Sequence, residues 1–124
     1  MCRIIPRIAA AIALIYGTGI AAIPASAHHS FALFDTENPL MLEGTVKTFE
    51  WSNPHSWIRL VVVDADNRPE DWSIELPAAG SLARDGWNKN YVRPGDRISV
   101  RISPLKNGMK GGSLQSFKPT AAER

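Results

Sequence analysis

The sequence has 124 residues, with 14 Lys and Arg against 12 Asp and Glu and a formal net charge of +2. This length excludes a multidomain enzyme or an α/β barrel, and 44% hydrophobic with 21% charged residues excludes a wholly disordered chain. Because Cys2 is the single cysteine, neither an internal disulfide nor a Cys-x-x-Cys site can form.

The first 27 residues have the three parts of a secretory signal peptide. Arg3 and Arg7 form its positive start, an apolar stretch rich in Ala, Ile and Leu follows over residues 8–23, and Ala-Ser-Ala at 25–27 suits signal peptidase. The apolar run of about 16 residues is shorter than the roughly 20 that span a bilayer. We therefore expect cleavage after residue 27, a periplasmic protein and no stable membrane insertion of the mature chain.

Cleavage changes the charge balance and sets the first residue of the mature chain. Removing Arg3 and Arg7 leaves 12 basic residues against 12 acidic residues, and it also removes Cys2. The remaining chain of about 97 residues is long enough for one modest hydrophobic core. Its first residue is His28.

From Leu40 onward the apolar residues alternate with polar residues, which is the period of a β-strand. The mature chain is therefore divided into a leader over residues 28–39, a barrel domain over 40–118 and a flexible tail over 119–124. Within the barrel domain, we expect strands over residues 40–51, 55–64, 71–76, 97–102 and 113–117, and a short helix over 77–87.

The order of the expected elements, three strands, a helix and two further strands, is that of an oligonucleotide/oligosaccharide-binding (OB) barrel. We predict an all-β fold with one short helix, built as a small five-stranded OB-like β-barrel, and an open five-stranded roll is the alternative. Gly44 inside the first strand indicates a bulge or a tight bend, and Gly86 is placed to end the helix.

Three histidines, His28, His29 and His55, are the candidate metal ligands. As the first mature residue, His28 offers both its α-amine and its Nδ1 to a metal, and both nitrogens bind when deprotonated. One more imidazole, from His55, completes a three-nitrogen histidine brace that suits Cu(II), and His29 is a substitute or auxiliary ligand. The alternative is that His28 and His29 form an exposed end and that His55 closes a turn by a hydrogen bond.

Three aromatic residues lie close to His55 in the sequence: Phe49, Trp51 and Trp57. They predict an aromatic rim for a ring-bearing ligand or a partner peptide, and the alternative is that they are packing residues. Glu50 and Glu75 are a conceivable carboxylate pair, but no pattern places them face to face.

The charge pattern and the missing motifs bear on the class of partner. The neutral mature chain, its scattered Lys and Arg residues and its exported location lead us to expect no nucleic acid partner. The sequence has no Gly-x-Ser-x-Gly nucleophile motif and no phosphate loop. We therefore expect a non-enzymatic protein with a periplasmic protein partner or a small ligand.

Several short segments recur together in one known family. In chain order they are His28-His29-Ser30-Phe31, Gly44-Thr45-Val46, Trp51-Ser52-Asn53-Pro54-His55-Ser56-Trp57, Arg84-Asp85-Gly86-Trp87, Pro94-Gly95-Asp96 and Pro104-Leu105-Lys106-Asn107-Gly108. From residue 28 to about residue 117 the chain resembles a family of short exported proteobacterial proteins, classified as domain of unknown function 6152. The resemblance implies an OB-type barrel behind a signal peptide, no established activity and a joint role for His28 and His55.

These observations predict a periplasmic, non-enzymatic binding protein that binds copper through His28 and His55. The alternative is a metal-independent module that binds a protein or a small ligand through the aromatic rim of Phe49, Trp51 and Trp57.

Overall fold

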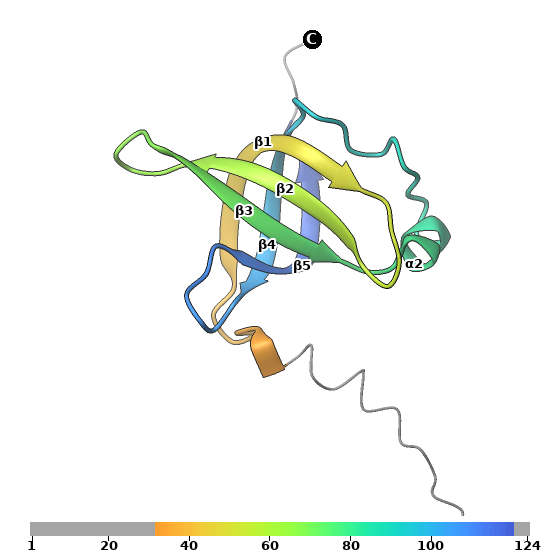
Figure 1. Ribbon diagram of the computed structural model, residues 1–124, viewed down its shortest axis with the longest axis horizontal. Coiled ribbons are helices and arrows are strands. Elements are labelled where there is room, and N and C mark those ends of the chain that lie inside the picture. Colours follow the sequence, from red (N-terminus) through yellow and green to blue (C-terminus); the bar gives the residue numbers. More distant parts are fainter. Residues whose placement is uncertain (1–31, 121–124) are drawn as a thin grey trace, which may run out of the picture.

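The computed structural model describes residues 32–120, in which the strands form one closed barrel (Figure 1). The elements are β1 (Leu40–Glu50), β2 (Ser56–Val63), β3 (Pro69–Leu76), α2 (Ala79–Arg84), β4 (Arg97–Pro104) and β5 (Gly111–Pro119). Around the barrel the strand order is β1-β2-β3-β5-β4, and the ends of this sheet meet because β1 also pairs with β4. This confirms the predicted all-β, OB-like barrel and excludes the open roll.

Strand β1 bends so that it can pair with two neighbours. Its first half pairs with β4 and its second half with β2, and Thr45 has a partner in both strands. At Gly44 a Cβ atom would collide with the carbonyl oxygen of Val61, so this position allows the two backbones to approach closely. The predicted irregularity is thus real, but the bulge itself lies further along, between Val46 and Thr48.

The parallel pairing of β3 with β5 closes the barrel on the opposite side. It comprises three residue pairs, which are Ser73 with Gly111, Ile74 with Gly112, and Glu75 with Ser113. A side chain at Gly112 would collide with the carbonyl oxygen of Ser103 on β4. Glycine therefore lets β5 lie tightly between β3 and β4.

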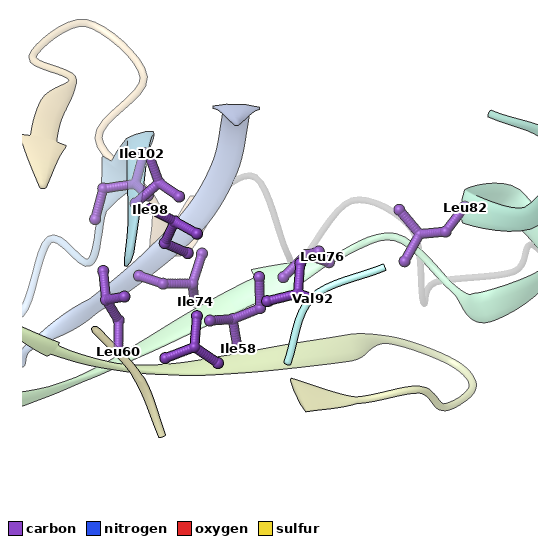
Figure 2. Close-up of a cluster of buried hydrophobic side chains, with 10 residues drawn as sticks. Ile58, Leu60, Ile74, Leu76, Leu82, Val92, Ile98 and Ile102 are labelled. Atoms are coloured by element: carbon purple, nitrogen blue, oxygen red, sulfur yellow. The ribbon is translucent and has the colours of Figure 1, made fainter. Parts of the chain in front are cut away.

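The barrel interior is filled by aliphatic side chains (Figure 2). They are Val46, Ile58, Leu60, Ile74, Leu76, Leu82, Val92, Ile98, Val100 and Ile102. Most come from alternate positions of the strands, so the residues between them face outward. Leu82 comes from α2 and lies beyond Leu76 and Val92, at one end of the cluster (Figure 2).

Helix α2 is shorter than the predicted helix and ends as expected at Gly86. The φ angle of Gly86 is 87°, a left-handed conformation that glycine adopts easily. The Trp87 amide donates to the carbonyl of Leu82 at 2.9 Å, and the Gly86 amide donates to that of Ala83 at 3.1 Å. These two bonds form a Schellman motif, which directs Trp87 back toward the barrel. Within residues 32–120, no helix is long and apolar enough to cross a membrane.

Candidate functional site

The loop between β1 and β2 holds His55 in a fixed position. Ser56, which is fully buried, donates its hydroxyl to the carbonyl of Ser52 and accepts the Ser52 amide, both at 3.2 Å. The Ser52 hydroxyl donates to the carbonyl of His55 at 2.6 Å. The amide of Ala79, at the start of α2, donates to the carbonyl of Ser52 at 3.0 Å. The serines therefore close this turn, and the imidazole of His55 is left for another contact.

That contact is with Glu75 on β3. His55 Nδ1 lies 3.2 Å from Glu75 Oε1, and the two side chains are 41% and 17% exposed. An ionised carboxylate can only accept a hydrogen bond, so Nδ1 is the ring nitrogen placed to donate to Glu75. This contact restrains the orientation of the imidazole ring.

Trp57 lies on the outer face of the barrel, next to this pair. Its neighbour Ile58 is fully buried, so the indole points outward, where it is partly exposed. Trp57 pairs in register with Glu50 on β1 and with Glu75 on β3. Cross-strand partners point to the same face. The two carboxylates therefore flank the indole, about 10 Å apart at their Cα atoms given the spacing of strands.

Phe49 and Trp51 lie elsewhere, in an aromatic cluster that packs against the barrel core. Their ring centroids are 6.0 Å apart, and Phe49 also lies 6.3 Å from Trp87. Trp87 stacks on Tyr91 at 4.1 Å and meets Phe117 edge-on at 5.1 Å. The structure thus brings Phe49 and Trp51 together but places Trp57 on a different surface.

Tyr91 and the partner of His55 were not identified from the sequence. Tyr91 lies in a loop in which apolar and polar residues do not alternate regularly, so no sequence signal marks it. Its side chain is 46% exposed. Glu75 is an outward position of an alternating strand, which the sequence does reveal. Its proximity to His55 depends on the register between β2 and β3, which alternation does not determine.

A second tryptophan, Trp72, lies toward the opposite end of β3. Its Nε1 donates to Glu70 Oε2 at 3.3 Å, and Lys110 Nζ lies 2.8 Å from Glu70 Oε1. The same ammonium is 5.5 Å from the centroid of the Trp72 ring. The hydrogen bond from Lys110 lowers the pKa of the Glu70 carboxyl below its ordinary value of 4.5, although desolvation opposes the shift. An indole and a carboxylate hold one cation here.

The two other predicted metal ligands, His28 and His29, lie outside the described residues. Within residues 32–120, no group of three or more His, Cys, Asp or Glu residues is close enough to hold a metal. Among the predicted metal ligands, the described part of the chain contains His55 alone.

The closed barrel, with its helix between β3 and β4, defines the class of this protein as an OB-fold domain. Such domains bind ligands on the outer face of the second and third strands and on the adjoining loops, which is where His55, Trp57 and Glu75 lie. More particularly, the chain belongs to a family of unknown function (DUF6152), whose family model matches residues 18–115. A comparison with curated proteins finds no match.

Solved structures with a similar fold include the mitochondrial single-stranded DNA-binding protein Rim1 from S. cerevisiae. One Rim1 structure has a TM-score of 0.51 and 11% sequence identity, and the match covers 66% of this chain and 92% of that one. A selenomethionine-labelled form has a TM-score of 0.47 and 11% identity over 67% and 93% of the two chains. At this identity the likeness establishes the shared fold.

This likeness corrects the expectation that nucleic acid is not a partner. The barrel shares its fold with a single-stranded DNA-binding protein, so the exclusion argued from composition was wrong. The physical reason is that single strands bind to local cations and to exposed aromatic rings on one surface. The net charge of a whole chain does not report such a surface.

Proposed function

We propose that this protein is an exported, non-enzymatic binding protein that binds copper through its N-terminal histidine and His55. The contact of 3.2 Å between His55 Nδ1 and Glu75 Oε1 carries this proposal. A histidine that binds a metal generally donates its other ring N–H to a carboxylate or a carbonyl, which fixes the tautomer and makes the ligating nitrogen more basic. His55 has this partner, and its ring is accessible.

The remaining ligands come from the start of the mature chain. After cleavage, His28 supplies the α-amine and Nδ1, and His55 supplies Nε2. Three nitrogens of this kind suit Cu(II), which prefers tetragonal nitrogen coordination. His29 is the auxiliary ligand. Copper bound in this way would be held by neutral imidazoles, with Glu75 orienting one of them.

The end of the leader is attached to the barrel, and this attachment limits how far His28 can reach. Phe34 forms a bridge with Leu105, and its neighbour Asp35 donates its amide to the carbonyl of Pro104 at 2.8 Å, so the leader is attached to the barrel there. Residues 32 and 33 are helical, and the Lys106 amide donates to the Leu33 carbonyl at 2.9 Å. The stretch over residues 28–31 therefore spans at most about 14 Å.

The distance to be covered follows from the strand pairing. The path from Phe34 to Glu75 takes three steps between neighbouring backbones, through Leu105, Gly111 and Ser73, and then two residues along β3. At about 5 Å per step and 3.3 Å per residue this path is roughly 21 Å long. The straight line is shorter because the path turns, and the brace requires the leader and the two histidine side chains together to span it.

The experiment is a Cu(II) titration of the processed protein. We expect submicromolar affinity, lost in His28→Ala, in His55→Ala and in a version with one additional residue before His28. His29→Ala, which removes the auxiliary ligand, should keep most of the affinity. If the N-terminally extended version binds Cu(II) as tightly as the processed protein, or if His55→Ala has no effect, the brace does not exist.

A second candidate function is the metal-independent binding of a small ligand at Trp57. It is favoured by the outward indole between Glu50 and Glu75 on the face that OB domains use. Trp57→Ala would then abolish ligand binding while His28→Ala would not. Copper-dependent binding that survives Trp57→Ala would argue for the first function alone.

A further inference from the structure

The surroundings of Trp72 show how this protein holds a cation against an indole. Lys110 Nζ lies 5.5 Å from the centroid of the Trp72 ring and 2.8 Å from Glu70 Oε1. The ammonium is thus attracted both by the face of the ring and by a carboxylate beside it. The indole and the carboxylate are themselves joined, since Trp72 Nε1 donates to Glu70 Oε2.

Trp57 also lies near two carboxylates, but on the outer face of the barrel, whereas Trp72 packs against the core. Glu50 and Glu75 are its register partners on either side. Among residues 32–120, no Lys or Arg lies over the Trp57 ring or forms an ion pair with either carboxylate. Arg59, the next outward residue on β2, donates instead to the hydroxyl of Ser73. Glu75 also lies 3.2 Å from His55 Nδ1, and its side chain is 17% exposed.

From this geometry we propose that the Trp57 face binds a short aliphatic diamine in its doubly protonated form. One ammonium lies at Glu50, the other lies at Glu75, and the methylene chain crosses the indole between them. Two carboxylates on opposite sides of one apolar ring match a ligand with a cation at each end better than a ligand with a single charge. The proposal rests on the second candidate function and deepens it, and it shares Glu75 with the proposed copper site.

The affinity follows from the exposure of the site. Exposed ion pairs contribute little and are screened by salt, so we expect dissociation constants in the millimolar range. The second ion pair makes putrescine bind about threefold to fivefold more tightly than butylamine, which has the same carbon chain and one ammonium. This preference disappears at high ionic strength.

The test is an NMR titration of the processed protein, freed of metal with a chelator, using putrescine and butylamine as probes. We expect putrescine to shift the indole N–H signal of Trp57, with Trp51, Trp72 and Trp87 as internal references. Trp57→Leu should abolish the response. Glu50→Gln should reduce putrescine binding to the level of butylamine and leave Cu(II) binding unchanged, because Glu50 lies on the side of the indole away from His55.

The matched control is Glu43→Gln, since Glu43 is another exposed carboxylate of β1 but pairs with Arg97 at 3.2 Å. It should leave the putrescine titration unchanged. Equal binding of the two probes, an equal effect of Glu43→Gln, or shifts centred on Trp72 would overturn the proposal. If another ligand still requires Trp57 while putrescine shows no preference, the diamine fails and the second candidate function survives.

Discussion

Replacing Glu75 with Gln tests whether its contact with His55 tunes a metal ligand. Glu75 Oε1 lies 3.2 Å from His55 Nδ1, and the Glu75 side chain is 17% exposed whereas that of His55 is 41% exposed. Gln keeps an oxygen that can accept the Nδ1 hydrogen but removes the charge that makes Nε2 more basic. Loss of such a partner weakens metal binding by about 10- to 100-fold. We expect Glu75→Gln near the lower figure and Glu75→Ala near the higher one.

The assay for this prediction is a Cu(II) titration in competition with a chelator of known affinity. Glu43→Gln is again the matched control. The Glu43 carboxylate on β1 also lies 3.2 Å from a basic side chain, that of Arg97 on β4, but it is not the partner of His55. Thermal unfolding checks that each variant keeps its fold. The reasoning is refuted if Glu75→Gln binds Cu(II) as tightly as the unchanged protein, or if Glu43→Gln weakens binding to the same extent.

Three further predictions concern stability. Gly44→Ala should destabilise the barrel by about 2 kcal/mol or more in urea unfolding, because the added Cβ collides with a backbone carbonyl. Gly80→Ala in α2 is the contrasting variant, because nothing lies within 4 Å of the added Cβ, and it should stabilise the protein by up to about 1 kcal/mol. Leu82→Ala, at a position 3% exposed, should cost about 2–4 kcal/mol, and a loss under 1 kcal/mol would show that α2 does not contribute to the core. The pKa of the Glu70 carboxyl is lower in the folded protein than its ordinary 4.5. The ionised carboxylate therefore stabilises the fold above pH 4.5, and this contribution is lost as the pH falls through the lower folded pKa. Lys110→Met should reduce this loss in urea unfolding measured between about pH 6 and 2.

The sequence was most informative where one face of a strand is buried throughout. The alternation of apolar and polar residues predicted the strands β3 and β4, and Ile74 and Val100 lie inside the barrel, because a closed barrel separates an apolar interior from solvent at every second residue. The order of the elements then indicated the OB topology.

The bulge in β1 shows why the candidate site was harder to predict. If the alternation of Leu42, Gly44 and Val46 continued unchanged, Phe49 would face solvent and Glu50 would face the interior. The extra residue between Val46 and Thr48 reverses this phase. Phe49 therefore joins the aromatic cluster, and Glu50 lies beside Trp57.

Long-range pairing limited the rest of the prediction. Val92 is 2% exposed and belongs to the core, yet it lies in a loop whose residues show no period. The approach of His55 to Glu75 depends on a register between two strands, and the stacking of Trp87 on Tyr91 depends on the path of the loop after α2. A single sequence contains no local signal for any of these contacts.

The short parallel pairing of β3 with β5 also determines where the barrel is expected to open. Three residues of β3 pair with β5, whereas eight pair with β2, so the seam between β3 and β5 has the fewest bonds to break in a local fluctuation. Glu75 belongs to this seam through its pairing with Ser113. A ligand that requires Glu75 in place binds the closed barrel and not the opened one. By linkage, such a ligand raises the free energy of opening the β3–β5 pairing. Bound copper or diamine would then slow amide hydrogen exchange along β5, on strand positions that the ligand does not touch.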